Sequence, residues 1–247
     1  MSQKRKEIQG QWLFRWRSYL PLLFVPFTVI ALRDSGLIGR LTNEHLDRCW
    51  ELGCLVLSLG GLAVRGVTIG HVPKKTSGRN TKEQIAAVLN TTGMYSVVRN
   101  PLYLGNFIIF LGMLLFVQVL WLVVLGILAF WLYYERIIAA EETFLEAKFG
   151  AEYIAWAEKT PAFFPRFRSW TTPALPFSLK NVLKREYTGF FVIVTSFTLL
   201  DIAEDFLGEG ILELEDGWLS FFIFGMAAYL TLRTMKRRTR ILHVEGR

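Results

Sequence analysis

The residues best suited to chemistry begin in the segment 93–105, which contains Arg99, Asn100 and Pro101. Asn followed by Pro is typical of the first turn of an α-helix, where free backbone N–H groups and the helix dipole favour an anion. Arg99 adds a positive charge beside that helix end. The segment therefore predicts a site for a carboxylate or phosphate. The structural alternative is a well-capped helix whose Arg extends to water.

A second segment contains the acidic pair Glu141 and Glu142. Neighbouring helical residues point in different directions, so one carboxylate can face a pocket while the other faces water. A carboxylate in a pocket can hold an ammonium group, and the alternative is a solvated helix face. Together, the two segments predict a site for a zwitterion, and S-adenosylmethionine is a zwitterionic cofactor.

The elements that must position these segments are predicted to be membrane helices. Of the 247 residues, 52% are hydrophobic and only 20% are charged. No charged residue occurs within 102–134. As one helix this stretch would be roughly 50 Å long, whereas the hydrocarbon core is ~30 Å thick. We therefore expect two helices with a break at 116–119, near Gln118.

Further apolar stretches raise the expected number of transmembrane helices to five or six. They occupy 19–32, 49–70, 187–207 and 217–232. The first is short and contains Pro21 and Pro26, so we expect a kinked or re-entrant segment there. The sequence thus predicts an all-α, polytopic membrane helical bundle.

Positive charge is concentrated in alternate loops. All but four of the 28 Lys and Arg lie in 1–18, 71–101, 135–187 and 233–247. The positive-inside rule places these segments, and with them both termini, in the cytoplasm. The basic run at 236–240 directly follows a span, so we interpret it as a topology signal that touches anionic lipid, and not as a nucleic-acid site.

Arg65 falls within a predicted span. A charge there is costly unless it is paired or wet, which makes Arg65 a candidate catalytic residue; the alternative is that its side chain extends to the membrane surface. The two cysteines, Cys49 and Cys54, lie in an apolar stretch, so we expect buried thiols and no metal site.

The two polar blocks together resemble the isoprenylcysteine carboxyl methyltransferase and phospholipid methyltransferase superfamily. The resemblance covers roughly 50–168. It is carried by two sets of residues: Gly93, Tyr95, Arg99, Pro101, Tyr103 and Gly105, and then Glu141, Glu142, Leu145, Phe149, Gly150, Glu152, Tyr153 and 163–165.

The resemblance implies an S-adenosylmethionine pocket covered by cytoplasmic helices. The implied cofactor residues are Ala87, Val88, Leu89, Asn90, Tyr95, Asn100, Pro101, Leu102, Tyr103 and Glu141, and the candidate catalytic residues are Arg99, Tyr103 and Arg65. The sequence departs from the family pattern at two positions. Asn100 replaces the usual His, and Ile137 replaces an Arg that precedes the first Glu, with Arg136 one position away.

The segments 74–81 and 89–93 resemble a narrower bacterial branch, the lipid A Kdo2 1-phosphate O-methyltransferases. A phosphate oxygen is already an anion and needs no base before it attacks. The candidate substrate-binding residues are basic and are expected on the cytoplasmic side: Lys74, Lys75, Arg79 and Arg136. Arg residues suit such an acceptor because they can bind it bidentately, although contact with lipid headgroups is an equal alternative.

We therefore expect a methyltransferase of the bacterial inner membrane that acts on a membrane lipid, with the 1-phosphate of lipid A as the leading acceptor. The alternatives are a prenylcysteine carboxylate, a phospholipid amine, or a non-catalytic scaffold or carrier. The expected organisation is an anchor and first span at 1–48, a methyltransferase core at 49–170, and a helical hairpin with a basic tail at 171–247. The sequence leaves the oligomeric state open.

Overall fold

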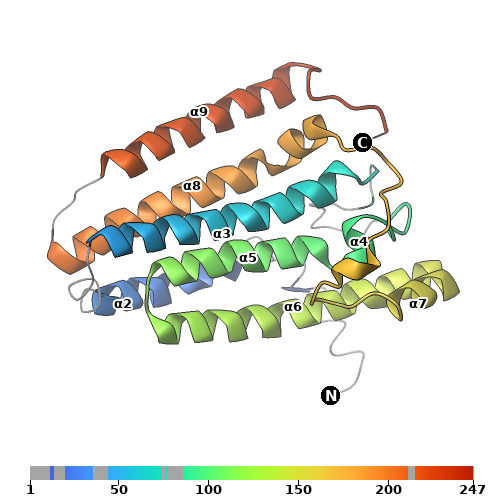
Figure 1. The fold of residues 1–247 in the computed structure, drawn as a ribbon, viewed down its shortest axis with the longest axis horizontal. Coiled ribbons are helices and arrows are strands. Elements are labelled where there is room, and N and C mark those ends of the chain that lie inside the picture. The colour runs from blue at the N-terminus through green and yellow to red at the C-terminus, as the bar shows by residue number, and fades with distance from the viewer. Residues whose placement is uncertain are drawn as a thin grey trace.

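A computed structural model describes residues 12–13, 20–35, 44–73, 76, 86–210 and 215–246. In these ranges the protein is helical and contains no strand, which confirms the all-α membrane bundle. Six elongated elements lie side by side along one direction (Figure 1). They are η1 and α2 (Leu20–Phe24 and Val25–Ser35), α3 (Glu44–Gly70), α5 (Pro101–Phe116), α6 (Leu120–Phe149), α8 (Leu179–Glu209) and α9 (Asp216–Arg238).

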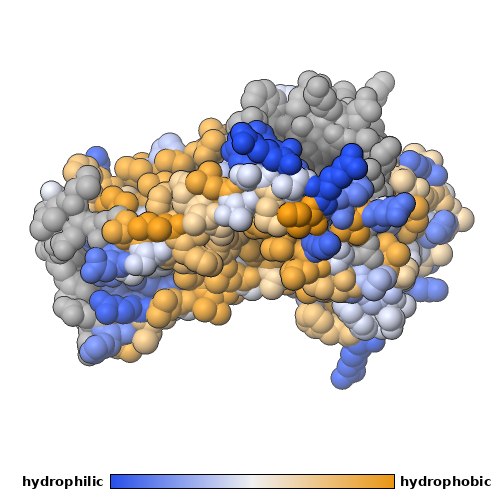
Figure 2. Space-filling view, turned by 90° about the horizontal axis from the view of Figure 1, so that it is seen from above, coloured by the Kyte–Doolittle hydropathy of each residue, from blue (hydrophilic) through white to orange (hydrophobic). Residues whose placement is uncertain are grey.

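Helices α3, α6 and α9 are long and apolar enough to cross a membrane, and α2 and α5 are shorter apolar helices. The surface agrees with this assignment. Apolar residues cover much of the middle of the long axis, and hydrophilic residues gather toward the ends (Figure 2). On α6, Leu120, Val124 and Leu128 follow one another at four-residue spacing and are all exposed. This stripe is suited to contact with lipid acyl chains.

The predicted break in the uncharged stretch is confirmed. Helix α5 ends at Phe116 and α6 begins at Leu120. Gln118 lies in this turn with a φ of 58°, and its side-chain amide donates to the carboxylate of Asp47 on α3. The turn is thus held by a polar contact at the end of the bundle opposite the motif loops.

Helices α3 and α5 pack closely against each other, and small residues permit it. A Cβ on Gly61 would lie 2.6 Å from the carbonyl oxygen of Gly105, and one on Gly112 would collide with Ser58. The hydroxyl of Ser58 donates to the carbonyl of Ile109 at 2.9 Å. Without a hydrophobic effect in lipid, such close approach supplies the packing energy.

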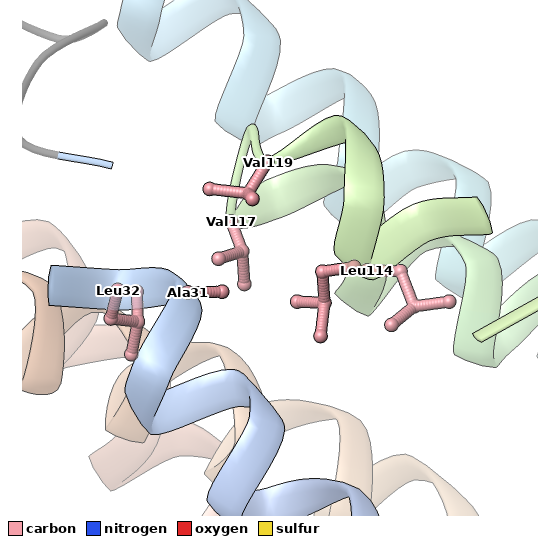
Figure 3. Packing of buried hydrophobic residues seen from close by; sticks show 6 residues of the cluster. Ala31, Leu32, Leu114, Val117 and Val119 are labelled. Atoms are coloured by element: carbon pink, nitrogen blue, oxygen red, sulfur yellow. The ribbon is translucent and has the colours of Figure 1, made fainter. Parts of the chain in front are cut away.

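The first predicted span is an interrupted element. A 3-10 turn over Leu20–Phe24 leads directly into α2, which contains Pro26 in its first turn. The far end of α2 is nevertheless anchored. Ala31 and Leu32 are buried against Leu114 near the end of α5 and against Val117 and Val119 of the α5–α6 turn (Figure 3).

The segments between the long helices that carry the sequence motifs gather at one end of the bundle (Figure 1). They include the short helices α4 (Met94–Val97) and α7 (Ala151–Ala157) and the 3-10 turn η3 (Phe167–Ser169). Gly150 separates α6 from α7 with a φ of 54°, a conformation that residues with a Cβ rarely adopt, so a glycine suits this end of α6.

Candidate functional site

The loop that carries the first motif is held against a later loop by backbone hydrogen bonds. Gly93 N–H donates to Thr171 at 2.9 Å, and Arg99 N–H donates to Pro161 at 2.8 Å. The indole N–H of Trp156 also donates to the carbonyl of Tyr95, at 3.1 Å. These bonds pair polar groups whose burial without a partner would cost free energy. They also hold the first motif in a fixed position relative to the second.

The two motif blocks meet at Tyr103 and Glu141. The Tyr103 hydroxyl donates to Glu141 Oε1 at 2.6 Å. Tyr103 is only 8% exposed and packs with Ile137 of α6 in one apolar cluster. The bond fixes the carboxylate at the edge of an apolar cluster. A carboxylate held in this way can accept from an ammonium group.

The second carboxylate of the pair has a different partner. Glu142 Oε1 lies 3.3 Å from Arg99 Nε, and both side chains are mostly buried. The two adjacent Glu residues therefore bind the two motif-bearing residues Tyr103 and Arg99. Glu142 is paired and does not face bulk water as the second carboxylate was expected to do.

Tyr153 of α7 lies beside this ion pair and is 4% exposed. Burial raises the pKa of its hydroxyl, and the negative charge of Glu142 raises it further. The phenol consequently remains protonated at physiological pH. It can donate a hydrogen bond there, but it cannot serve as a base.

The start of α5 is arranged differently from the simple side-chain cap that the sequence predicts. The Asn100 carbonyl accepts from the backbone N–H groups of Tyr103 (3.1 Å) and Leu104 (3.0 Å). Its side-chain amide donates to Ala162 at 3.1 Å and makes no cap. Pro101 has no N–H, so the capacity of this helix end to bind an anion rests mainly on the backbone of Leu102.

The upstream segment of the implied cofactor site is not helical over 86–92. Ala87 and Val88 are exposed, Leu89 is buried and Asn90 is half-buried. Tyr95 is half-buried in α4. This places a partly open, apolar strip next to the first motif in the chain.

Arg65 lies within the helical bundle, and its guanidinium nitrogens donate hydrogen bonds to neighbouring side chains. Its Nε and Nη2 donate to the two carboxylate oxygens of Glu186, both at 2.8 Å, and its Nη1 donates to Asn106 at 2.6 Å. The Arg65 and Glu186 side chains are 14% and 5% exposed. The alternative that Arg65 extends to the membrane surface is therefore wrong, because a buried carboxylate holds it in place.

The ion pair of Arg65 and Glu186 is connected to the motif residues through Asn106 and Tyr134. Asn106 donates to the Tyr134 hydroxyl at 3.1 Å, and the rings of Tyr134 and Tyr103 lie 4.8 Å apart between centroids. Gly105 makes room for this arrangement, since a Cβ there would lie 2.5 Å from Arg65 Cγ. Arg65 thus contacts the same polar and aromatic network as Tyr103.

Sequence reasoning missed Asn106, Tyr134 and Glu186 as members of this network. Asn106 is a polar residue in an otherwise apolar helix, which was a usable signal. No comparable signal marks Glu186, because it falls in a segment that the charge pattern assigns to the cytoplasm. Helix α8 in fact begins at Leu179, so Glu186 lies two turns inside it.

The predicted substrate-binding residues divide into two groups. Arg136 is exposed on α6, and no hydrogen bond or ion pair of this side chain occurs in the described part of the chain. Lys74, Lys75 and Arg79 lie outside the residues that the structure describes.

Comparison with known proteins finds similarity in the part of the chain that carries the two motif blocks. A family model for phospholipid methyltransferases matches residues 53–152. The protein-S-isoprenylcysteine O-methyltransferase of Saccharomyces cerevisiae is 35% identical over 124 residues, which cover 47% of this chain and 49% of the yeast enzyme. The chain therefore spans about half the length of that relative.

Two bacterial relatives have names from metal resistance. The cobalt-zinc-cadmium resistance protein CzcN of Cupriavidus metallidurans is 34% identical over 165 residues, covering 64% of this chain and 73% of the relative. The nickel-cobalt-cadmium resistance protein NccN of Alcaligenes xylosoxydans xylosoxydans is 36% identical over 142 residues, covering 55% and 63%. No solved structure is significantly similar to the chain. By these matches and the paired motifs, the chain belongs to the superfamily of membrane methyltransferases that contains the phospholipid and isoprenylcysteine methyltransferases.

Proposed function

We propose that this protein transfers a methyl group from S-adenosylmethionine to an anionic oxygen of a membrane lipid, and that this oxygen belongs to the 1-phosphate of lipid A. The observation that carries the catalytic part is the 2.6 Å hydrogen bond between Tyr103 and Glu141. It joins the two motif blocks of the superfamily at the end of the bundle where the motif loops gather. A scaffold or carrier would not require this pairing.

The residues present fit the cofactor. Glu141 offers a fixed carboxylate for its ammonium group, and the start of α5 at Pro101 and Leu102 offers the positive end of a helix dipole for its carboxylate. The strip at 87–90 and Tyr95 offer apolar and half-buried surface for the remainder. When bound, S-adenosylmethionine supplies an electrophilic methyl group.

The protein's own part in such a transfer is alignment and exclusion of water. An in-line displacement gains most from holding donor and acceptor in one geometry. Tyr103 orients Glu141, and Arg99 is held by Glu142 next to the start of α5. We assign Arg99 and Arg65 to positioning, because each already has a carboxylate partner in the described structure.

An acceptor that is already an anion agrees with the groups near the motifs. Tyr153 is protonated, and His71 Nδ1 is within hydrogen-bond distance of the Leu175 carbonyl, at 2.9 Å. Tyr153 therefore cannot deprotonate an amine, and His71 lies outside both motif blocks. We therefore favour a phosphate oxygen, with Lys74, Lys75, Arg79 and the exposed Arg136 as its proposed contacts.

A prenylcysteine carboxylate is the second candidate acceptor, because the yeast relative is named for that reaction. A carboxylate likewise needs no base. A phospholipid amine is the third, from the family name alone. We place the active site on the cytoplasmic side of a bacterial inner membrane, with both termini on that side, because the basic loops flank the motifs.

The names of the two bacterial relatives do not lead us to propose a metal site. In the described ranges, no three His, Cys, Asp or Glu side chains are close enough to hold a metal ion. A link to metal resistance through lipid methylation is compatible with those names, since an altered surface charge changes how cations associate with a membrane.

Mass spectrometry of total lipids tests the acceptor. A deletion strain should lack one methyl group on the lipid A phosphate, and wild-type protein should restore it. Glu141→Ala should fail to restore it, while Glu135→Ala, an exposed carboxylate on the same helix, should succeed. Methyl loss from a prenylated protein or a phospholipid amine would contradict the lipid A assignment and support the corresponding alternative.

A further inference from the structure

We infer that the C-terminal part of the protein forms a separate pocket for a phosphate group, supplied by an anionic lipid headgroup or by soluble phosphate. The pocket is an open-sided hollow of about 140 Å³. Its lining residues are Lys184, Lys236, Thr239, Arg240, Leu242 and His243. None of them belongs to the motif blocks, so this inference goes beyond the proposed methyl transfer.

Three different elements bring these side chains together. Lys184 lies in the second turn of α8, and Lys236 lies in the last turn of α9. Arg240 and His243 follow in the chain after α9. The start of α8 is tied to the end of α3 by the bond from Ser178 N–H to the Gly70 carbonyl, at 3.0 Å. The pocket is therefore at the same end of the bundle as the motif loops (Figure 1).

The positive charge of the pocket is uncompensated in the described part of the chain. Lys184, Lys236 and Arg240 form no ion pair there, unlike Arg65 and Arg99. Lys236 Nζ instead lies 5.0 Å from the centroid of the Tyr187 ring. A cation–π contact restrains the lysine without neutralising it. Clustered like charges repel one another, so an anion in the hollow would stabilise the arrangement.

The chain after α9 folds in a way that a simple topology signal does not require. Thr239 Oγ1 donates to the Met235 carbonyl at 2.6 Å, and His243 N–H donates to the Arg240 carbonyl at 2.9 Å. Leu242 is 3% exposed and anchors this turn. The positive-inside rule needs only charge near a span. A turn with a buried anchor additionally sets where Arg240 and His243 lie.

The lining chemistry suits a phosphate group. Lysine ammonium groups bind phosphate as point charges, and an arginine guanidinium can bind two phosphate oxygens at once. The helix ends that form the pocket adjoin the membrane surface, where phospholipid headgroups are abundant.

The test measures lipid binding by the full-length protein without any cofactor, so its outcome is independent of methyl transfer. Purified protein in neutral detergent is titrated with phosphatidylglycerol or with phosphatidylcholine, and retained lipid is counted by native mass spectrometry. The pocket variant is Lys236→Gln/Arg240→Gln. The matched control is Arg237→Gln/Arg238→Gln, which removes the same charge from adjacent exposed residues that do not line the hollow.

We expect the pocket variant to bind phosphatidylglycerol at least ~fivefold more weakly than wild type and the control variant to stay within ~twofold. Lys184→Gln on α8 should weaken binding as well, and it provides an independent answer if the double variant does not fold. Equal weakening in both double variants, or no weakening in the pocket variants, would overturn the proposal.

A competition with inorganic phosphate distinguishes the two sources. Displacement of phosphatidylglycerol by phosphate at constant ionic strength supports a site that recognises the phosphate group itself. If wild type binds inorganic phosphate but retains phosphatidylglycerol no better than phosphatidylcholine, soluble phosphate is the ligand. Binding of neither overturns the inference.

Discussion

At the scale of the residue, the adjacent carboxylates of α6 show how one helix can support two parts of a site. Glu141 accepts from Tyr103, and Glu142 pairs with Arg99. Both partners come from the first motif, but they lie on either side of the Asn100-Pro101 helix start. The two Glu residues therefore hold the start of α5 between them.

Glu141→Ala should weaken the binding of S-adenosylhomocysteine to the purified protein at least tenfold, or ~1.4 kcal/mol. The reason is loss of the carboxylate that we assign to the ammonium group. Isothermal titration measures the change, with Glu135→Ala as the control because that side chain is exposed on the same helix. An unchanged dissociation constant for Glu141→Ala would refute the assignment.

Sequence alone singled out Tyr103 and Glu141 because both belong to dense, recognisable motifs, and the structure brings them into contact while their functional roles stay predictions. It did not predict that Glu142 would pair with Arg99, since periodicity gives the direction of a side chain but not its partner. Asn100 shows the same limit. Its type predicts a cap, whereas the nearby Ala162 carbonyl, which is 62 residues away in the chain, takes its side-chain amide.

At the scale of the element, the contact between α3 and α5 depends on the absence of a side chain at Gly61. Gly61→Ala should destabilise the protein by about 1–3 kcal/mol, because the new Cβ would lie 2.6 Å from the Gly105 carbonyl oxygen and 2.8 Å from Ile109 N. Thermal unfolding in detergent measures the effect.

Gly60→Ala is the matched control for this substitution. The neighbouring position has nothing within 4 Å of its Cβ, so the change should be neutral or should stabilise the helix by up to ~1 kcal/mol. Equal melting temperatures for the two variants would show that the helices do not pack as described.

The ion pair between Arg65 and Glu186 connects α3 to α8, and a double-mutant cycle measures it. Arg65→Met or Glu186→Leu alone should cost about 3–5 kcal/mol, because each leaves a buried charge without its partner. The double variant should cost less than either single change. Strict additivity in unfolding experiments would contradict the pairing.

The pair between Arg48 and Glu215 provides a matched comparison. It has the same residue types but a separation of 3.9 Å, and its side chains are 67% and 53% exposed. The corresponding cycle should therefore yield no more than ~1 kcal/mol of coupling.

Element boundaries were predictable where charge ends abruptly and less so elsewhere. The uncharged stretch and Gln118 located the α5–α6 turn. The start of α8 was predicted too late, because Lys180, Lys184 and Arg185 read as a cytoplasmic loop although they belong to a helix. Charged residues with long side chains are compatible with a helix that continues past the membrane surface.

At the scale of the whole molecule, the arrangement of the helices predicts the two ends to lie on opposite sides of the membrane. Cys54 is buried as predicted, but the prediction of a buried thiol is wrong for Cys49, which is exposed because its side chain does not face the helix contacts. In a background with both cysteines replaced by Ser, Asp216→Cys at the start of α9 should react with a membrane-impermeant maleimide in intact cells. Lys159→Cys after α7 should react only after lysis. Both positions are exposed.

This labelling pattern follows from the positive-inside rule. The segment 135–187, which contains Lys159, is basic, whereas the segment before Asp216 is acidic. The reverse pattern would place the motif loops outside the cell. It would thereby remove the access to cytoplasmic S-adenosylmethionine that the proposed function requires.

The buried salt bridge of Arg65 also bears on how such a protein can change in evolution. The match to the phospholipid methyltransferase family model ends at residue 152, yet the counter-ion of Arg65 comes from residue 186, in the hairpin that follows. The hairpin is therefore not a free-standing appendage that can be gained or lost in one step. Its loss would leave a bare cation among apolar helices, so a viable lineage must replace the arginine first or retain both helices together.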